Sequence, residues 1–455
     1  MEDDDIEDPS LLEQVKEYDL KQNHELRMEC KTGRDVRIML EEGSAEVFGA
    51  ELQKGNAVDV SGQKLAVYTW TGCKLKVQGL PAMIYEAEDT PVAVYCNLHQ
   101  MLRQSRQDAQ QQQQQDQQAG GAPSTQEEGG QRRPPFNIRG RGPRVIIVGP
   151  TDSGKSTLTK TLLNWGVRDN WEPTFVDLDV GQGTVTAPGC IAAVPIEAPL
   201  DITEGCSSLD MPLVYFYGHA SAGDNPELYK YLVDRLAGVL ERRAAANPHA
   251  AASGMIINTM GWVEGLGYEL QVHAINAFKA DVVVVLDADR LHSQLSTELK
   301  DTGCQVLKLP KSGGVVTRER EERRNARDAR LKDYFYGPRG TLMPSTQQLR
   351  ADQVLVFRVG GGPRAPNSAL PIGAVSATDP LRVSHVAGSA ELVQSVMAVS
   401  HAPTPEQALS SNVAGFVLVK DVDVARGTIT VLSPAPGPLP NKYLVTGSLR
   451  SAGLV

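Results

Sequence analysis

Apolar residues in the first hundred positions recur at every second position. Leu26, Met28 and Cys30 share one face of an expected strand, and the run at residues 65–70 is followed by another at residues 73–77. Glycines such as Gly72 interrupt these runs at short intervals. Strands of this length, bounded by turns, predict a small all-β sandwich or barrel that ends near residues 94–98.

A different pattern begins near residue 144 and continues to about residue 337. Apolar, β-rich runs alternate there with stretches of helical periodicity. The expected strands are residues 145–148, 174–178, 213–217, 254–258 and 281–286, and the clearest expected helices are residues 228–243 and 270–279. Runs this apolar are typical of a parallel sheet that is covered by helices on both faces. Beyond Pro344 short strands return, for example at residues 415–419 and 428–432, and they predict a third, β-rich domain.

Two segments lack either periodicity. Residues 1–20 hold nine acidic residues against the single Lys16, which predicts a solvated tail. Residues 107–118 are almost pure glutamine, and residues 119–135 are rich in Gly, Pro and Gln. We interpret this stretch as a disordered linker, with a glutamine-rich activation or aggregation segment as the alternative.

These patterns divide the chain into five expected segments. They are an acidic disordered tail (1–20), an N-terminal β-sandwich domain (21–100), a Gln-rich linker (101–139), a central α/β domain (140–338) and a C-terminal β-rich domain (339–455).

The 455-residue chain carries 55 acidic and 45 basic residues, a formal charge of −10. Taken alone, this balance argues against a nucleic-acid partner. The tail contributes −8 of it, since nine acids face one lysine, so little is left for the rest of the chain. No apolar run approaches the roughly 20 residues of a membrane helix, so no membrane partner is expected. Six dispersed cysteines favour a reducing compartment, cytosol or nucleus.

The strongest motif lies at residues 149–156, Gly-Pro-Thr-Asp-Ser-Gly-Lys-Ser, which fits G-x-x-x-x-G-K-[ST]. It follows an expected strand and precedes a helical stretch at residues 157–163, which is the context of a P-loop. Backbone N–H groups and the helix N-terminus would cradle phosphates, Lys155 would bridge the β- and γ-phosphates, and Ser156 would ligate Mg²⁺. The alternative is a Gly/Lys turn that opens an ordinary helix. The motif and its context favour nucleotide binding by a P-loop NTPase-type sheet between two β-rich domains.

Two carboxylates end expected strands and could act beside the nucleotide. They are Asp179 and Asp287, and either could simply cap the turn that follows it. Gly181 and Gly183 follow Asp179 and would allow the backbone to approach a ligand closely, which favours Asp179. No N-K-x-D precedes Asp287, which argues against a GTPase switch.

An arginine-rich segment at residues 318–330 follows a Gly-Gly pair at residues 313–314. Arg323, Arg327 and Arg330 recur at helical spacing, and planar guanidinium groups suit phosphoryl transfer. Interspersed glutamates allow the alternative of a solvated helix with Glu–Arg pairs. Beside a P-loop, we favour a mobile arginine lid.

Several strings in the chain resemble a known family. They are Gly-Pro-Thr-Asp-Ser-Gly-Lys-Ser-Thr (149–157), Asp-Val-Gly-Gln-Gly (179–183), Asn-Thr-Met-Gly-Trp-Val (258–263), Asp-Val-Val-Val-Val-Leu-Asp (281–287), Ser-Gly-Gly-Val-Val (312–316), Tyr-Phe-Tyr-Gly (334–337) and Val-Leu-Ser-Pro-Ala-Pro (431–436), with further matches at residues 25–27 and 64–70. The sequence resembles the Clp-type polynucleotide 5′-hydroxyl kinases, the family of the mRNA cleavage and polyadenylation factor subunit also linked to tRNA splicing. The resemblance covers nearly the whole chain except the acidic tail and the glutamine tract.

The resemblance implies a role for each matching position. The ATP phosphates would be cradled by Asp152, Ser153, Gly154, Lys155, Ser156 and Thr157, and Mg²⁺ would be held by Ser156 and Asp179. Asp179 would deprotonate the RNA 5′-hydroxyl, and the lid residues Arg318, Arg323 and Arg327 would stabilise the transferring charge. Glu25 and Lys64 would contact the adenine end.

The resemblance also implies two positions that would contact RNA. Trp262 would stack on a base near the 5′ end, and a core tryptophan is the alternative. Residues 217–224 lie where the family carries a Thr-Pro-containing clasp; here Ser221 keeps a hydroxyl but the proline is missing.

The expected function is an ATP-dependent RNA 5′-hydroxyl kinase that is also a nuclear subunit of the pre-mRNA 3′-end cleavage and polyadenylation machinery. The implied partners are RNA with a 5′-hydroxyl end, other subunits of the mRNA cleavage factor complex, and the tRNA splicing endonuclease. The alternative is an ATP-bound, non-catalytic scaffold subunit of the same complex.

Overall fold

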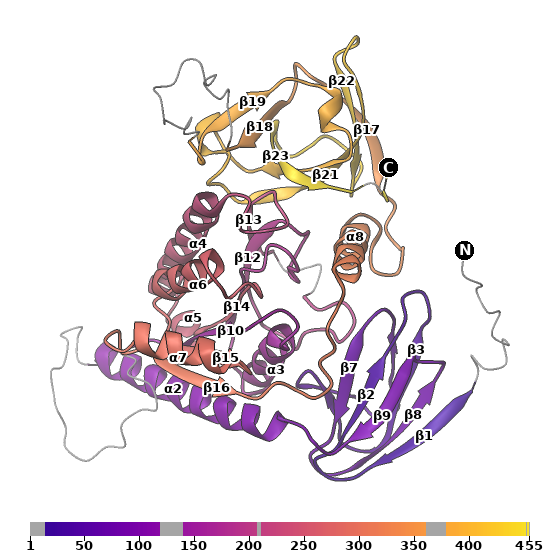
Figure 1. Ribbon diagram of the computed structural model, residues 1–455, viewed down its shortest axis with the longest axis vertical. Helices are drawn as coiled ribbons and strands as arrows, with labels where there is room; N and C mark the ends of the chain where they lie inside the picture. The colour runs from indigo at the N-terminus through magenta and orange to yellow at the C-terminus, as the bar shows by residue number, and fades with distance from the viewer. Residues whose placement is uncertain (1–13, 119–139, 207–210, 361–378, 452, 455) are drawn as a thin grey trace.

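The computed structural model describes residues 14–118, 140–206, 211–360, 379–451 and 453–454. Three bodies are visible in it (Figure 1): two β-rich domains at opposite ends and an α/β domain between them. This arrangement confirms the expected α/β fold with flanking β-rich domains.

The N-terminal domain is a sandwich of two antiparallel sheets. One sheet has the order β1 (Val15–Leu20), β8 (Cys73–Gln78), β3 (Val36–Gly43) and β6 (Ala57–Val60). The other has the order β5 (Ala50–Glu51), β4 (Glu46–Val47), β7 (Lys64–Tyr68), β2 (Glu25–Glu29) and β9 (Met83–Ala87). The alternating residues Leu26 and Met28 are buried between the sheets with Val36 and Ile38, as the period of two requires.

One part of the predicted acidic tail was wrong. Residues 15–20 form β1 and pair antiparallel with β8, because Leu20 joins the sandwich core while the acidic Glu17 and the half-buried Tyr18 lie along an edge strand. Residues 1–13 lie outside the described residues.

The predicted Gln-rich linker was also wrong over its first half. Residues 92–118 form one helix, α2 (Val92–Gln118), which also replaces the end of the sandwich expected at residues 94–98. Tyr95, Leu98, Leu102 and Ala109 are buried along one face of α2, against the central domain. Glutamine has a good helix propensity, so this buried face can extend into a helix through the glutamines. Residues 119–139 lie outside the described residues.

The central sheet contains seven strands. Their order is β13 (Leu213–Phe216), β12 (Cys190–Pro195), β11 (Thr174–Asp177), β14 (Met255–Asn258), β10 (Arg144–Val148), β15 (Val282–Leu286) and β16 (Gln305–Leu309). Five neighbouring strands are parallel, as expected: β11, β14, β10, β15 and β16. In contrast, β12 pairs antiparallel with both β11 and β13. The connections between β11, β12 and β13 contain no helix in the described residues, so no crossover returns the chain to a parallel register there.

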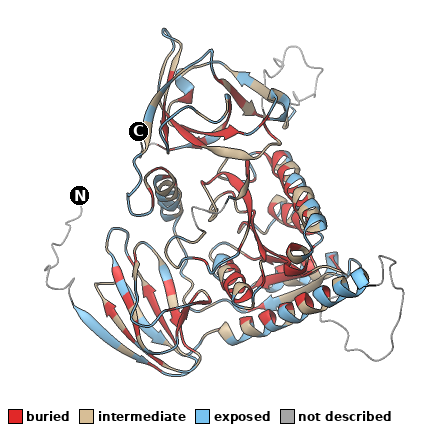
Figure 2. Ribbon diagram, turned by 180° about the vertical axis from the view of Figure 1, so that it is seen from behind, coloured by how far each residue is buried: buried red, intermediate tan, exposed pale blue. Residues whose placement is uncertain are grey.

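Helices cover both faces of this sheet. They are α3 (Lys155–Arg168), α4 (Pro226–Ala246), α5 (Pro248–Ser253), α6 (Leu266–Ala277), α7 (Asp289–Glu298) and α8 (Arg320–Tyr336). Along β10, Ile146 and Val148 belong to the core on one face, and Val145 and Ile147 to the core on the other. Figure 2 shows that buried residues concentrate in these strands. Burial on both faces explains why the strands are apolar at every position.

The C-terminal domain is a seven-stranded sheet that packs on the edge of the central sheet. Its order is β17 (Ser345–Arg350), β22 (Thr428–Ser433), β21 (Val413–Asp423), β20 (Ser395–Ser400), β23 (Tyr443–Arg450), β18 (Leu355–Val359) and β19 (Val383–Val386), with short 3₁₀ turns at Ala390–Leu392 and Pro405–Gln407. Phe216 of β13 meets Phe416 of β21 at 6.0 Å between ring centres. The N–H of Val214 donates to Oδ1 of Asn412 at 2.7 Å.

Candidate phosphate-binding site and arginine lid

The P-loop connects β10 to α3 at the carboxyl edge of the parallel strands. Gly154 (φ 88°) precedes Lys155, the first residue of α3, and Asp152 also adopts a left-handed conformation (φ 55°). This geometry turns the loop back over the N-terminus of α3, where backbone N–H groups and the helix dipole favour an anion. The hydroxyl of Ser153 is buried and has no hydrogen-bond partner in the described residues, so it can donate to a phosphate oxygen.

Lys155 is held inside its own loop. Its Nζ donates to the carbonyls of Gly149 and Pro150 at 3.0 and 2.9 Å, and the residue is only 7% exposed. Burial lowers the pKa of Lys155 to about 8, and the charges of Asp179 and Asp152 oppose that effect. Two carbonyls are weak substitutes for phosphate anions, so the ammonium group is available for a nucleotide.

Two carboxylates stand at the end of β11. Asp177 is fully engaged: it accepts from Asn258 Nδ2 at 3.0 Å and from both the N–H and the hydroxyl of Thr184 at 2.7 and 2.9 Å. Asp179 accepts from the N–H groups of Gly181 and Gln182 through Oδ1, both at 3.0 Å. Its Oδ2 accepts no hydrogen bond from the described residues, so that oxygen is free to receive a proton.

The electrostatic setting of Asp179 suits a general base. Burial and the neighbouring charge of Asp177 raise the pKa of Asp179 to about 6, although Lys155 and the two N–H donors act in the opposite direction. A carboxyl group with a pKa just below neutral pH is mostly ionised yet basic enough to accept a proton in a reaction.

The predicted lid contains the helix α8, and two arginines meet the P-loop: Arg323 in this helix and Arg318 two residues before its start. The N–H and Nε of Arg318 both donate to Asp152 at 2.9 Å, and Nη1 of Arg323 donates to Asp152 at 3.3 Å. Burial alone would raise the pKa of Asp152, but these contacts with Arg318 and Arg323 outweigh it and lower the pKa. Asp152 was expected to belong to the phosphate cradle, which stays a prediction; its carboxylate joins the P-loop to the lid through Arg318 and Arg323.

Two further contacts join the lid helix to the loop that carries Asp179. The carbonyl of Arg323 accepts from Gln182 Nε2 at 3.3 Å, and Arg330 Nη2 donates to the carbonyl of Thr184 at 2.5 Å. Arg327 is half-buried, and burial lowers its pKa. The lid helix therefore contacts both the P-loop and the loop that carries Asp179. A capping box formed by Glu319 and Glu322 starts the helix.

The structure does not bring Glu25 and Lys64 together. Glu25 is opposite Tyr68 in the β2–β7 pair, whereas Lys64 is opposite Glu29, four residues away, and pairs with it at 3.2 Å. Lys64 is exposed. Glu25 is buried and accepts from Arg27 Nε at 2.5 Å and from the hydroxyl of Thr90 at 2.8 Å.

Sequence reasoning missed Arg27, which links the N-terminal domain to the lid. A Cβ atom built on Gly314 would lie 2.9 Å from Cδ of Arg27, so the guanidinium stem packs directly on the Gly-Gly segment before the lid. Arg27 is also 5.8 Å from the ring centre of Tyr85. Arg27 could have been identified from the sequence, because it belongs to the string at residues 25–27 that matches the family. Asp177, two residues before Asp179 on the same face, could have been found from that spacing.

Trp262 is not a core tryptophan, because 39% of its surface is exposed. Its ring packs on glycines: a Cβ atom on Gly223 would lie 3.1 Å from Cζ3, and one on Gly267 would lie 2.5 Å from Cγ. Gly223 belongs to the same loop as Ser221, whose hydroxyl accepts from the Gly223 N–H at 3.3 Å. The two predicted RNA-contacting residues are thus neighbours.

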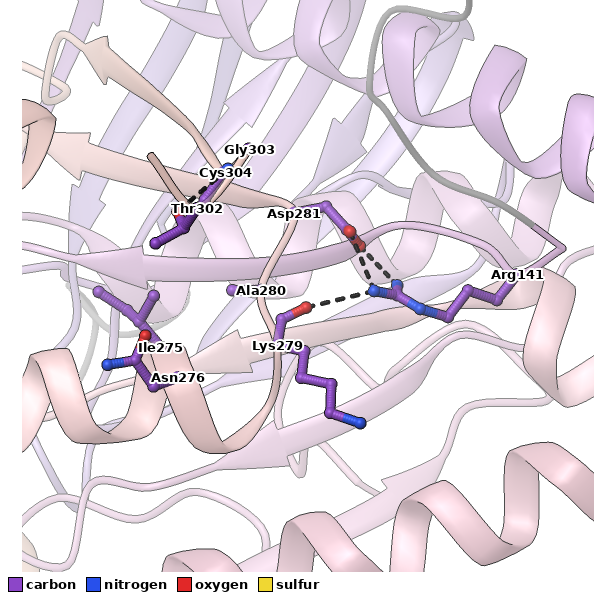
Figure 3. A pocket seen from close by; sticks show the side chains of 9 residues that line it. All are labelled: Arg141, Ile275, Asn276, Lys279, Ala280, Asp281, Thr302, Gly303 and Cys304. Carbon is purple, nitrogen blue, oxygen red and sulfur yellow. Dashed lines mark hydrogen bonds and ion pairs between the residues drawn. The ribbon is translucent and has the colours of Figure 1, made fainter. Parts of the chain in front are cut away.

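A pocket of about 310 Å³ lies away from the P-loop (Figure 3). Its residues precede β10, β15 and β16, so it opens at the amino edge of the parallel strands. Arg141 donates to both oxygens of Asp281 there, at 2.6 and 3.0 Å. Burial raises the pKa of Cys304, which also lines the pocket, to about 12. The paired charges and the unreactive thiol give this pocket no chemistry of its own.

Within the part of the chain that the structure describes, no helix has the length and apolar character needed to cross a membrane. Nor do three or more His, Cys, Asp or Glu side chains gather there in a way that could hold a metal ion. Any Mg²⁺ at the P-loop would rest on few protein ligands, and the exposed Ser156 hydroxyl and Oδ2 of Asp179 are the groups of the kind it prefers.

Comparisons with known proteins agree with this geometry. Three family descriptions match in sequence order: "N-terminal beta-sandwich domain of polyadenylation factor" over residues 19–109, "mRNA cleavage and polyadenylation factor CLP1 P-loop" over residues 149–337, and "Pre-mRNA cleavage complex II protein Clp1" over residues 342–451.

Curated relatives match over nearly the full length. The chain is 47% identical over 438 residues to the protein CLP1 homolog of Arabidopsis thaliana, covering 96% of this chain and 94% of that protein. It is 41% identical over 439 residues to the polyribonucleotide 5′-hydroxyl-kinase Clp1 of Gallus gallus, covering 96% of each. A solved Clp1p–Pcf11p complex aligns with a TM-score of 0.76 at 22% identity, covering 96% of this chain and 98% of that one, and it shares the fold.

Proposed function

The chain belongs to the family of the mRNA cleavage and polyadenylation factor Clp1, and we propose that it is an ATP-dependent RNA 5′-hydroxyl kinase. One observation carries the proposal: Asp179, whose Oδ2 accepts no hydrogen bond from the described residues, stands beside a complete P-loop under an arginine lid. That set contains a base, a phosphate cradle and counter-charges for phosphoryl transfer.

The proposed reaction assigns one role to each side chain. Oδ2 of Asp179 accepts the proton of the RNA 5′-hydroxyl while the hydroxyl oxygen forms a bond to the γ-phosphorus of ATP. The bond from that phosphorus to the β–γ bridging oxygen breaks, which leaves ADP and a 5′-phosphorylated RNA. Lys155 leaves the carbonyls of Gly149 and Pro150 to bind the β- and γ-phosphate oxygens.

The lid supplies positive charge in this scheme. Arg318 and Arg323 exchange part of their contact with Asp152 for the transferring phosphoryl group, and Arg327 approaches it from the next turn of α8. Planar guanidinium groups bind phosphate oxygens in pairs and stay charged, although burial lowers the pKa of Arg327.

We assign Mg²⁺ to Ser156 and Asp179. When bound, the ion neutralises phosphate charge. The Ser156 hydroxyl and the Asp179 carboxylate would hold the ion, which would supply only this neutralisation of charge. Ser153, Gly154 and Thr157 complete the phosphate cradle. For the adenine end, the separation of Glu25 from Lys64 along β2 and β7 favours Glu25 over the exposed Lys64, because Glu25 pairs with Arg27, which packs on the Gly-Gly segment before the lid.

The RNA end would lie between Trp262 and Ser221. An exposed indole ring offers a base-stacking surface that accepts any base, contributing roughly 1–3 kcal/mol. The Ser221 hydroxyl can bind a sugar or phosphate oxygen next to it.

We further propose that the protein works as a nuclear subunit of the pre-mRNA cleavage complex. Its family description and the Clp1p–Pcf11p complexes support assembly with a Pcf11-like subunit. The tRNA splicing endonuclease is a second proposed partner, which rests on the resemblance alone.

Transfer of label from γ-labelled ATP to oligoribonucleotides tests the kinase function. Label should enter a 5′-hydroxyl oligonucleotide, and none should enter the same oligonucleotide with a 5′-phosphate. Lys155→Ala should abolish the transfer. A wild-type protein that retains ATP but labels neither oligonucleotide would overturn the proposal.

That outcome would support the second candidate, an ATP-bound scaffold. The observation in its favour is the closed state of the site, in which Lys155 is bound to its own loop and the lid is bound to Asp152. A closed lid slows nucleotide release whether or not phosphate is transferred.

A further inference from the structure

The loop between β13 and α4, residues 217–225, is the structural centre of the RNA-end site, and we call it the clasp loop. Tyr217 organises it from within: its hydroxyl contacts the carbonyls of Ser221 and Ala222 at 3.0 Å and accepts from the N–H of Asn225 at 2.9 Å. The buried hydroxyl of Tyr217 therefore holds the backbone of the clasp loop in place.

The clasp loop contacts two parts of the proposed site. Gly223 lies against the ring of Trp262. At Gly181, in the loop that follows Asp179, a Cβ atom would lie 3.0 Å from the carbonyl of Ala220. A displacement of the clasp loop would consequently move the surface beneath Trp262, on the side of the loop that faces the RNA end.

The C-terminal domain holds the other side of this loop. The N–H groups of Ser448 and Leu449 in β23 both donate to the carbonyl of Gly218, at 2.8 and 3.0 Å. Nδ1 of His219 and the hydroxyl of Ser448 share a hydrogen bond of 2.7 Å. The backbones meet without side chains between them, since a Cβ atom on Gly447 would lie 2.1 Å from the Gly218 carbonyl.

Asn225 makes a second connection to the C-terminal domain. Its Oδ1 caps α4 by accepting from the N–H of Leu228 at 3.1 Å, while its Nδ2 donates to the carbonyl of Pro380 at 2.8 Å. The residue is only 8% exposed. One amide thus fixes the end of the clasp loop, the start of a helix and the C-terminal domain.

We propose that the C-terminal domain is part of the RNA-end site, where it positions the clasp loop and Trp262 through Asn225 and Ser448. The inference rests on the proposed function, because it names what that site uses to hold RNA. The clasp loop has no proline to restrict its backbone, and the contacts from β23 and Pro380 supply the restriction instead. These are positioning residues: their loss weakens RNA binding and leaves the ATP site intact.

Asn225→Asp separates the two functions of the amide. Aspartate is as good a helix cap as asparagine, so α4 keeps its cap, but the donor to Pro380 is lost. Loss of one such hydrogen bond predicts a KM for a 5′-hydroxyl oligoribonucleotide about fivefold higher, with kcat and ATP affinity unchanged. Ser448→Ala should give a similar split between KM and kcat.

The matched control is Asn412→Ala. It removes another hydrogen bond between the central and C-terminal domains, the one to Val214, without touching the clasp loop. It should lower the melting temperature and leave the RNA KM unchanged. An unchanged RNA KM in both Asn225→Asp and Ser448→Ala, or an equal rise in Asn412→Ala, would overturn the inference.

Direct RNA binding keeps this test independent of turnover. If the wild type transfers no phosphate, the kinase proposal fails, and the dissociation constant of a fluorescent 5′-hydroxyl oligoribonucleotide is compared instead. A fivefold weaker complex with Asn225→Asp but not with Asn412→Ala supports the inference, and equal affinities overturn it.

Discussion

Replacing Asp152 by asparagine is expected to release the arginine lid from the P-loop. The carboxylate side chain is 4% exposed and accepts three hydrogen bonds, two from Arg318 and one from Arg323. Asparagine keeps the size of the side chain and one acceptor oxygen but loses the charge. The guanidinium groups then lack their counter-ion.

The size of the effect follows from those contacts. A hydrogen bond to a charged group contributes about 1.5–3 kcal/mol. The arginine side chains are 39% and 29% exposed, so water replaces part of what is lost. A net change of roughly 2–3 kcal/mol in favour of the open lid corresponds to a shift of about 30- to 150-fold in the opening equilibrium.

Hydrogen exchange of the nucleotide-free protein measures this equilibrium. Amides of α8 exchange through lid opening, so their exchange rate should rise by the same factor in Asp152→Asn. Asp289→Asn is the control, because it breaks an exposed ion pair with Lys308 at the start of α7 and should leave α8 unchanged. A change in α8 exchange of less than about threefold in Asp152→Asn would refute the reasoning that Asp152 holds the lid.

Three further outcomes follow from the site and its supports. Because only the ionised Asp179 can accept a proton and its pKa is raised to about 6, kcat/KM should fall tenfold per pH unit below about pH 6; a fall that begins only near pH 4 would contradict this. Gly261→Ala should weaken ATP binding in equilibrium dialysis at least about tenfold, because its Cβ atom would lie 2.5 Å from the hydroxyl of Thr151 in the P-loop. The control Gly238→Ala in α4 should bind ATP as the wild type does, and equal ATP affinities in the two variants would contradict this packing. Arg106→Met in α2 should leave the melting temperature unchanged or raise it. The guanidinium group is fully buried, and its two terminal nitrogens have no hydrogen-bond partner in the described residues. A marked drop in melting temperature would show instead that this charge stabilises the fold.

The parts of the fold that follow local rules could be predicted from the sequence. The period-two runs gave the N-terminal sandwich, and apolar runs such as residues 281–286 gave the strands of the central sheet. The P-loop was predictable because its glycines and lysine occupy fixed positions between a strand and a helix.

Features that depend on tertiary contacts could not be predicted in this way. The glutamine tract has the composition of a linker, but the buried face of α2 extends into a helix through the glutamines. The reversed direction of β12, which is antiparallel to both β11 and β13, depends on connections that contain no helix in the described residues. In the sequence, nothing distinguishes Asp152 from the other variable residues of the P-loop. Its role in holding the lid depends on Arg318, which is 166 residues away along the chain.

Among the predicted functional residues, some are brought together by the fold and others are not. Lys155 and Asp179 come together because they follow the ends of β10 and β11 in one sheet, and Arg318 and Arg323 reach them by pairing with Asp152 of the P-loop. Glu25 and Lys64 stay apart because adjacent strands place them at different register positions. Those two assignments came from the resemblance alone, and matching sequence strings do not show which residues lie opposite each other in paired strands.

The most direct test of the kinase assignment is single-turnover transfer from γ-labelled ATP to a 5′-hydroxyl oligoribonucleotide by the wild type and by Asp179→Asn. General base catalysis contributes about 10²–10⁴-fold, so Asp179→Asn should transfer at least about 100-fold more slowly while it still binds ATP. Equal transfer rates in the two proteins would contradict the assignment of Asp179 as the base that activates the RNA hydroxyl.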